Sequence, residues 1–225
     1  MVKPKKEIII GAVILLAIIL IIVFREPQQE VIVEQQPVVE QEVIEVKAPE
    51  PEYLYIPDTL NSRIQVFDQE GKFVKTIATA GRDEGELRMP TDTLIFNNQL
   101  YVLDKGNNRV QVYDLEGNFK FAFGEKKLKF PLGFERYQDT IYIADTYNTE
   151  VDMFSLDGEY ISSFGKRGKK DGEFRYPSDI AVDEQGVFVL DTDNNRIQVF
   201  DHSGKFTAKW GVYSSEEYGL RFPFG

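Results

Sequence analysis

The 225-residue sequence has no cysteine and a single histidine, His202. The lack of cysteine excludes disulfides, thiolate metal sites, a cysteine nucleophile and a lipid-attachment cysteine in this sequence. One histidine excludes a metal site made from two histidines of this chain. Acidic residues outnumber basic ones, and the formal net charge is −11. Because an acidic domain repels phosphate backbones, we expect no nucleic-acid partner.

Residues 8–24 form a long apolar run without a charged or polar side chain. At about 1.5 Å per residue, a helix of this length is near the short limit for crossing a bilayer. Lys3, Lys5 and Lys6 precede the run and acidic residues follow it. The positive-inside rule therefore predicts a cytoplasmic stub (1–7), a single-pass transmembrane helix (8–24) and an extracytoplasmic remainder. The alternative is a cleaved signal peptide, although the run ends without a small-x-small cleavage site.

Residues 25–52 contain two basic residues, eight acidic residues and four prolines. Like-charge repulsion and proline favour an extended, disordered stalk over a strand. Fully extended, this segment would hold the next domain roughly 85 Å from the membrane.

From Tyr53 onward one unit is repeated four times. Its copies begin YLYIPDTLNSRIQVFDQEGKF, LYVLDKGNNRVQVYDLEGNF, IYIADTYNTEVDMFSLDGEY and VFVLDTDNNRIQVFDHSGKF. Their first aspartates are Asp58, Asp104, Asp145 and Asp191, which are 46, 41 and 46 residues apart. A fixed period in the forties, made of short alternating runs, indicates a β-propeller rather than a helical solenoid.

Each copy divides into four short runs separated by turn residues. In the fourth copy the predicted strands are residues 179–182, 187–190, 196–200 and 205–210. β-Branched and aromatic residues alternate with polar ones, and a glycine follows a polar residue in the hairpin, as in a twisted antiparallel blade. We therefore predict an all-β propeller domain over residues 53–225.

The repeated residues resemble those of the NHL repeat, a family of usually six-bladed propellers. In three copies Asp-x-x-Asn-x-Arg is followed by Ile/Val-Gln-Val, an aromatic residue and Asp. The connections 81–90 and 168–177 resemble the family's G-x-x-x-G-x-F-x-x-P pattern. The resemblance covers residues 53–225 and implies four-stranded blades. It is closest in type to the membrane-anchored, extracytoplasmic sensor domains of the family.

The repeat is incomplete at both of its ends. The first copy begins at its second strand, and Phe222-Pro-Phe-Gly225 stands where a further first strand would begin. About four blades are present where the family usually has six, so we expect an open arc that is a fragment of a six-bladed ring. A four-bladed ring is the alternative, but residue 225 stops several residues short of the closing strand that would hide the sheet edges.

The repeated Asp-x-x-Asn-x-Arg residues are predicted to maintain the blades rather than to perform chemistry. Asp and Asn shape the loop through side-chain-to-backbone hydrogen bonds. The guanidinium fork suits carboxylates and carbonyls of its own or the neighbouring blade. This structural set is Asp58, Arg63, Asp104, Arg109, Asp145, Asp191 and Arg196.

The third copy departs from the repeat. Glu150 replaces the expected Arg, Ser155 replaces the later Asp, and Tyr147 lies in the same loop. Glu150 near Asp145 would make a like-charge pair. The substitution reflects either sequence drift or a contact to a cation or ligand. Tyr147 is a candidate recognition residue.

A ligand is expected on the face formed by the Asp-x-x-Asn loops and the connections between blades, because function tends to sit on variable loops over a rigid scaffold. This surface, called the loop face below, comprises residues 59–62, 81–90, 105–108, 124–131, 146–149, 165–177, 192–195 and 211–223. Its basic connections contribute Lys126, Lys127, Lys169 and Lys170 as candidate contacts to an anionic partner. Asp92 and Asp179 start innermost strands and are predicted to line the axial channel with carboxylates, which would suit a cation such as calcium.

The leading functional hypothesis is a non-catalytic scaffold or sensor module that binds a protein, peptide or glycan outside the cell without a cofactor. The second is a calcium-dependent propeller hydrolase of the lactonase type, which needs only Asp, Asn and Glu. The amidating-lyase chemistry of related propellers is disfavoured, because His202 falls in a strand hairpin away from the axis. RNA binding and ubiquitin transfer, known from NHL proteins with RING domains, are rejected because this chain has no cysteine and an acidic domain.

Overall fold

The computed structural model describes residues 53–211 and 220–224. The chain divides into two units, Met1–Lys47 and Ala48–Gly225, and the described residues belong to the second. The predicted stub (1–7), transmembrane helix (8–24) and stalk (25–52) lie outside the described residues. In the described part of the chain, no helix is long and apolar enough to cross a membrane.

The described residues form four antiparallel blades, the first with three strands and the others with four. Blade 1 comprises β1 (Leu54–Asp58), β2 (Arg63–Phe67) and β3 (Phe73–Ile77), and blade 2 comprises β6 (Pro90–Phe96), β7 (Gln99–Asp104), β8 (Arg109–Asp114) and β9 (Phe119–Phe123). Blade 3 comprises β10 (Phe134–Tyr137), β11 (Thr140–Asp145), β12 (Glu150–Ser155) and β13 (Tyr160–Phe164). Blade 4 comprises β14 (Pro177–Asp183), β15 (Gly186–Asp191), β16 (Arg196–Phe200) and β17 (Phe206–Trp210). A short parallel pair, β4 (Thr79–Ala80) and β5 (Glu86–Leu87), lies in the connection between blades 1 and 2.

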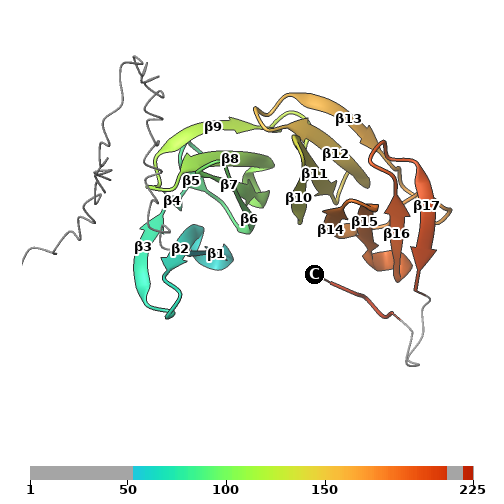
Figure 1. Cartoon of the computed structure of the whole chain (residues 1–225), viewed down its shortest axis with the longest axis horizontal. Helices are drawn as coiled ribbons and strands as arrows, with labels where there is room; N and C mark the ends of the chain where they lie inside the picture. Colours follow the sequence, from blue (N-terminus) through green and yellow to red (C-terminus); the bar gives the residue numbers. More distant parts are fainter. Residues whose placement is uncertain (1–52, 212–219, 225) are drawn as a thin grey trace, which may run out of the picture. The chain divides into compact units, whose positions relative to one another are not determined.

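The strands of each blade follow chain order from the inside outward. The first strands of neighbouring blades contact each other: β1 with β6, β6 with β10, and β10 with β14. Figure 1 shows these strands on the concave side of the arc that the blades form, with β9, β13 and β17 on the convex side. The prediction of an all-β, open propeller of about four blades is therefore confirmed.

A tight loop joins the second and third strands of blades 2, 3 and 4, and the corresponding loop of blade 1 joins β1 and β2. In blades 1, 2 and 4 it is a single 3-10 turn: η1 (Thr59–Asn61), η2 (Lys105–Asn107) and η3 (Thr192–Asn194). Each turn ends in a left-handed residue with φ between 55° and 57°, namely Ser62, Asn108 and Asn195. The strand register then places Asp104 opposite Arg109, and the same pairing recurs in blades 1 and 4. A carboxylate and a guanidinium therefore meet at the same edge of these blades.

The hydrophobic core lies between neighbouring blades, because each sheet is apolar on both faces. Between blades 2 and 3, Tyr101, Leu103 and Val112 pack against Ile141 and Phe154. The alternate residues of the same strands, such as Leu100 and Val102, pack against Ile64 and Val66 of blade 1. This use of both strand faces explains the nearly continuous apolar runs in the second strands.

The predicted strand boundaries of the fourth copy agree with the structure to within two residues. The largest difference is at β14, which begins at Pro177 rather than at residue 179, because Pro177 pairs with Asp191 across a bulge. The turn residues that separate the runs are local signals, and this is why the boundaries could be predicted well.

Residues 220–224 repeat the geometry with which an inner strand starts. Phe222 has a positive φ of 46°, as Met89, Phe130 and Tyr176 do at the same position before proline. The Phe222 N–H donates to Asn195 Oδ1 at 2.8 Å, and Phe130 N–H donates to Asn108 Oδ1 at 2.7 Å in the same way. This segment therefore has the local form of the start of a further inner strand.

Candidate functional site

In three of the blades, the repeated aspartate accepts hydrogen bonds from an Asn, an Arg and a Gln of its own blade. In blade 2 the Asp104 Oδ2 atom accepts hydrogen bonds from Asn107 (2.8 Å), Arg109 Nε (3.0 Å) and Gln111 Nε2 (3.2 Å). In blade 4 Asp191 accepts the same three bonds from Asn194, Arg196 and Gln198. Blade 1 repeats the set with Asp58, Asn61, Arg63 and Gln65. One carboxylate is thus matched by one guanidinium, and the network carries no formal net charge.

In blades 2 and 4 this network also holds the connection that precedes the blade. Arg109 Nη2 donates to the carbonyls of Asp83 (2.8 Å) and Glu86 (3.0 Å), and the Gln111 side chain accepts from Gly85 N–H (2.9 Å). Arg196 binds the carbonyls of Lys170 and Glu173 in the same manner. The Arg and Gln therefore fasten a neighbouring loop.

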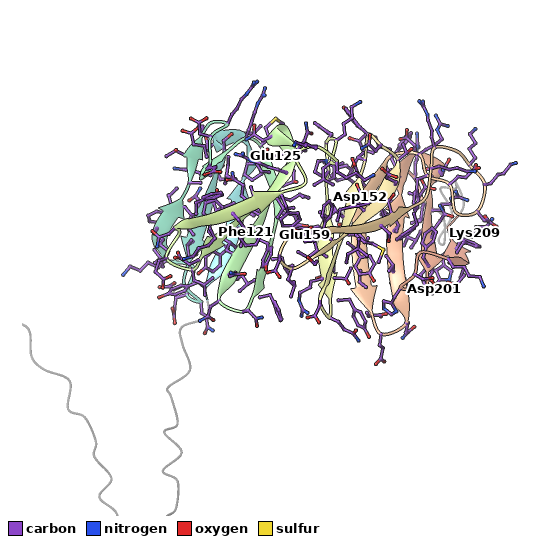
Figure 2. All side chains as sticks on the ribbon, turned by 90° about the horizontal axis from the view of Figure 1, so that it is seen from above. Phe121, Glu125, Asp152, Glu159, Asp201 and Lys209 are labelled. Atoms are coloured by element: carbon purple, nitrogen blue, oxygen red, sulfur yellow. The ribbon has the colours of Figure 1, made fainter. Side chains whose placement is uncertain are left out.

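Blade 3 has a different cluster at this place. Its preceding connection, residues 124–131, has 8 residues, whereas residues 78–90 and 165–177 have 13 each. The segment that would offer carbonyls to an Arg and a Gln is missing, and Glu150 and Asp152 occupy these two positions. Lys127 of the short connection lies with its Nζ atom 2.8 Å from Glu150 Oε1 and 3.1 Å from Asp152 Oδ1. Figure 2 shows Asp152 inside blade 3 and Glu125, on the connection, nearer the loop face.

The acid cluster of blade 3 comprises Asp145, Glu150 and Asp152, with one oxygen of each within 4.8 Å of the others. Asp145 and Asp152 are fully buried, and Glu150 is partly buried. Asp145 accepts hydrogen bonds from Lys129 N–H (2.9 Å) and Asn148 Nδ2 (2.7 Å). Burial raises the pKa of both Asp145 and Asp152, although hydrogen bonds and Lys127 act in the opposite direction. Three acids and one lysine leave this cluster with a formal charge of −2 when all are ionised.

Asp152 is the functional candidate that sequence reasoning missed. The signal was present in the repeat register, because the position of Gln65, Gln111 and Gln198 is an aspartate only in the third copy. Lys127, predicted as a loop-face contact, instead pairs with two acids inside the blade. Its ammonium also lies 5.1 Å from the Tyr160 ring centroid.

The loop face has an open hollow of about 260 Å³ between blades 3 and 4. Three cations, two tyrosines and one acid contribute to its lining: Lys129, Arg167, Arg175, Tyr147, Tyr176 and Asp193. Tyr147 is about half exposed and stacks on Phe130, with ring centroids 4.5 Å apart. The Lys105 ammonium lies over the Phe130 ring, 4.9 Å from its centroid. The two basic connections therefore meet here, through Lys129 and Arg167.

The other predicted loop-face lysines lie elsewhere. Lys126 and Lys127 line a second hollow with Phe123 and Tyr160, toward the outer strands. The backbone N–H groups of Lys169 and Lys170 both donate to Glu173 Oε2, so these residues shape their loop. Tyr147 and the acid Glu150 are not brought into one site: Tyr147 lines the loop-face hollow, and Glu150 lies in the cluster of blade 3.

The predicted axial carboxylates lie on innermost strands. Asp92 of β6 accepts hydrogen bonds from the backbone N–H groups of Thr93 (2.8 Å) and Phe134 (3.2 Å). Burial, together with the smaller effect of the negative charges of Asp179 and Glu135, raises the pKa of Asp92 to about 6 against those two hydrogen bonds. Asp92 therefore lies within electrostatic reach of carboxylates on the innermost strands of the next two blades.

The raised pKa of Asp92 predicts a pH-dependent stability. An unfolded Asp titrates near 3.9, so between that pH and about 6 the folded state keeps a proton that the unfolded state has lost. The free energy of unfolding should therefore decrease as the pH rises through this window, by up to about 3 kcal/mol in total. In Asp92→Asn this pH-dependent part of the free energy of unfolding should disappear. Urea denaturation of both proteins between pH 4.5 and 7.5 measures the free energy of unfolding. Parallel stability profiles of the two proteins would contradict the prediction.

His202 lies in the β16–β17 hairpin. Its ring stacks on Tyr137 with centroids 4.4 Å apart, and its Nε2 atom is 2.8 Å from the Asp183 carbonyl oxygen. In the described residues it thus belongs to a contact between blades 3 and 4, away from the axial carboxylates.

The fold resembles those of several solved structures. Virginiamycin B lyase from Staphylococcus aureus is 14% identical with a TM-score of 0.59, over 75% of this chain and 55% of the lyase chain. Hydrazine synthase of Kuenenia stuttgartiensis is 14% identical with a TM-score of 0.56, over 77% and 52% of the two chains. The WD40 domain of Pan2 from Neurospora crassa is 12% identical with a TM-score of 0.55, over 72% and 47%. At such identities the likeness shows the fold alone, and the chain spans about half the length of these structures.

No curated protein matches the sequence. A family model does match: DUF5128, described as a 6-bladed beta-propeller, over residues 40–132 and 132–212. The description names no activity and does not separate NHL repeats from other propeller repeats. Because the match covers more than half of the 225 residues, the chain belongs to this 6-bladed beta-propeller family.

Proposed function

We propose that this protein is a non-catalytic binding module whose loop face recognises an acidic segment of a partner protein. The observation that carries the proposal is the hollow between blades 3 and 4. It presents Lys129, Arg167 and Arg175 against a single acid, Asp193, in a chain whose net charge is −11. Such a local reversal of sign steers an acidic partner to one face and orients it there.

The tyrosines of the hollow suit protein recognition. Tyr147 and Tyr176 both line it, and Tyr147 is held in place by its stack on Phe130. A rigid aromatic ring offers a large contact area at low entropic cost, and interfaces are enriched in Tyr and Arg for this reason. The three cations would pair with carboxylates of the partner, and the tyrosines would cover the apolar side chains between them.

A labelled octaglutamate peptide serves as the probe for this hollow. The double charge reversal Arg167→Glu/Arg175→Glu is expected to weaken binding at least tenfold, which corresponds to about 1.4 kcal/mol. No side-chain hydrogen bond or ion pair of either arginine in the described residues is lost by the change. Fluorescence anisotropy at low and at physiological salt measures the affinity.

The matched control is Lys169→Glu/Lys170→Glu, which changes the net charge equally on the same connection but at residues that do not line the hollow. It should reduce the affinity less than threefold. Equal losses in the two double variants would mean that the peptide responds only to net charge, and the hollow would then not be the binding site.

We also propose that the module is displayed outside the cell on the apolar segment at residues 8–24. The support is the charge pattern around this segment, with lysines before it and acids after it. Because the chain has no cysteine, Glu159→Cys supplies a single thiol on an exposed turn. A membrane-impermeant maleimide should label it in intact cells, whereas Lys5→Cys should stay unlabelled until the cells are lysed. The reverse pattern would place the propeller on the inside.

A calcium-dependent hydrolase is the second candidate. It is favoured by Asp92, Glu135 and Asp179, whose carboxylates lie on successive innermost strands and interact electrostatically. Calcium-stimulated hydrolysis of a simple lactone that is lost in Asp92→Asn, while octaglutamate does not bind, would favour this function over the binding module.

A further inference from the structure

The acid cluster of blade 3 has no role in the loop-face hollow or at the axis. We propose that Asp145, Glu150 and Asp152 form a Ca²⁺ site inside blade 3, and that the ammonium of Lys127 is a built-in competitor for it. The site is independent of the proposed binding function.

The geometry of the cluster suits a cation of this size. Oxygen atoms of the three carboxylates lie within 4.8 Å of one another. Ca²⁺ binds oxygen at about 2.3–2.6 Å, so two ligands on opposite sides of the ion are about 5 Å apart. One ion can therefore contact all three acids without a change in the strand register.

Asp152 provides a second and independent observation. Its side chain is completely buried, and neither carboxylate oxygen accepts a hydrogen bond within the described part of the chain. Lys127 Nζ lies 3.1 Å from Oδ1, which is an ionic contact without hydrogen-bond geometry. A buried carboxylate without hydrogen bonds is costly, and such groups are usually paired, protonated or bound to a metal.

Blade 3 differs from blades 2 and 4 in the charged side chains that it holds at this place. In blades 2 and 4 the same place holds one Asp, one Arg and one neutral Gln. In blade 3 it holds three acids and one lysine, which is a formal excess of two negative charges when all are ionised. A divalent cation would neutralise this excess.

The donor set selects the class of metal. Carboxylate oxygens are hard ligands, which suit Ca²⁺, Mg²⁺ and Mn²⁺ rather than Zn²⁺ or Cu²⁺. The cluster contains no histidine or cysteine. The ligands come from two adjacent strands. Ca²⁺ tolerates irregular coordination by such a set better than Mg²⁺ does. Ser163 Oγ, which donates to Glu150 Oε2 at 3.0 Å, holds the more exposed acid in place.

Lys127 determines access to the site. Its side chain is about one-third exposed and borders the second hollow, beside the Tyr160 ring. Rotation of its flexible stem toward the hollow would release Glu150 and Asp152 and keep the ammonium beside the ring. Calcium and the ammonium therefore compete for the same carboxylates, which predicts a weak site, on the order of 10⁻⁴–10⁻³ M as in extracellular modules.

The test uses the full chain, purified in detergent, with Tb³⁺ as a luminescent probe that Tyr160 can sensitise and that Ca²⁺ displaces. Lys127→Met should tighten Ca²⁺ binding at least tenfold, because the competitor is gone. Lys126→Met removes the neighbouring charge, which touches none of the three acids, and should leave the affinity within twofold of the wild type. Asp152→Asn should abolish the sensitised signal.

Glu150→Gln is a second loss-of-site variant at a position that is partly exposed, and it is used if Asp152→Asn does not give the wild-type circular dichroism spectrum. The proposal is overturned if Lys127→Met binds Ca²⁺ no more tightly than Lys126→Met. It is also overturned if the acid variants bind Ca²⁺ as the wild type does, since the acidic surface alone would then account for the signal.

Discussion

Arg109→Met is expected to lower the free energy of unfolding by about 3–5 kcal/mol, the range for breaking a buried ion pair. The Arg109 side chain is 4% exposed and its partner Asp104 is fully buried. The variant removes hydrogen bonds to Asp104 (3.0 Å), Glu125 (2.9 Å) and the carbonyls of Asp83 and Glu86. It leaves an uncompensated carboxylate inside the protein.

The electrostatics of this pair support the size of the effect. Burial raises the pKa of Asp104 even though Arg109 and three hydrogen bonds oppose it. Burial lowers the pKa of Arg109, but the hydrogen bonds and charges of Glu125 and Asp104 outweigh it and raise this pKa overall. The Asp104 side chain is fully buried, so water cannot stabilise its charge if the guanidinium is removed. Asp104 therefore depends on the guanidinium.

Arg63→Met in blade 1 is the matched control. Arg63 makes the same Nε bond to Asp58 at 2.8 Å, but its side chain is 40% exposed and it binds no connection among residues 53–211 and 220–224. Exposed pairs contribute about 0–1 kcal/mol, so this variant should lose no more than that. Urea denaturation of both variants at pH 7 measures the difference. Equal losses would show that the connection and the burial do not matter.

Gly158→Ala is expected to cost about 2–5 kcal/mol. Gly158 has a φ of +83°, which is unfavourable for alanine by about 1–2 kcal/mol. A Cβ atom there would also lie 2.6 Å from Cβ and 2.7 Å from Cγ of Phe123 on the neighbouring blade. Phe123 is buried in the core between blades 2 and 3 and cannot move away freely. Overpacking of this kind costs a further 1–3 kcal/mol or more.

The equivalent glycine of blade 1 separates the two contributions. Gly71 has nearly the same φ, +78°, but nothing lies within 4 Å of a Cβ built on it. Gly71→Ala should therefore cost only the conformational part, about 1–2 kcal/mol. Thermal denaturation of the two variants makes the comparison, and an equal loss would mean that Phe123 yields to the extra methyl group.

The fold could be predicted from the sequence to a large extent, since its signals are local. Each hairpin glycine, turn aspartate and alternating run lies within a few residues of the strand that it bounds, and four copies reinforce one another. The strand boundaries of the fourth copy were predicted to within two residues for this reason. The site could be predicted only in part. Glu150 departs clearly from the repeat because it reverses a charge, whereas the Gln-to-Asp change at Asp152 exchanges two polar residues of similar size and is a weak signal in the sequence.

The sequence by itself determined the four blades, their order and the acidic character of the domain, because period, alternation and charge are properties of the chain. The tertiary structure decided what the departures mean. A connection five residues shorter removes the carbonyls that an Arg and a Gln would bind, and it brings Lys127 to two acids on another strand. The packing of blade 3 on blade 2 places the hairpin residue Gly158 against Phe123. These contacts join residues on different strands and connections. The distances between such elements are fixed only when the blades pack together.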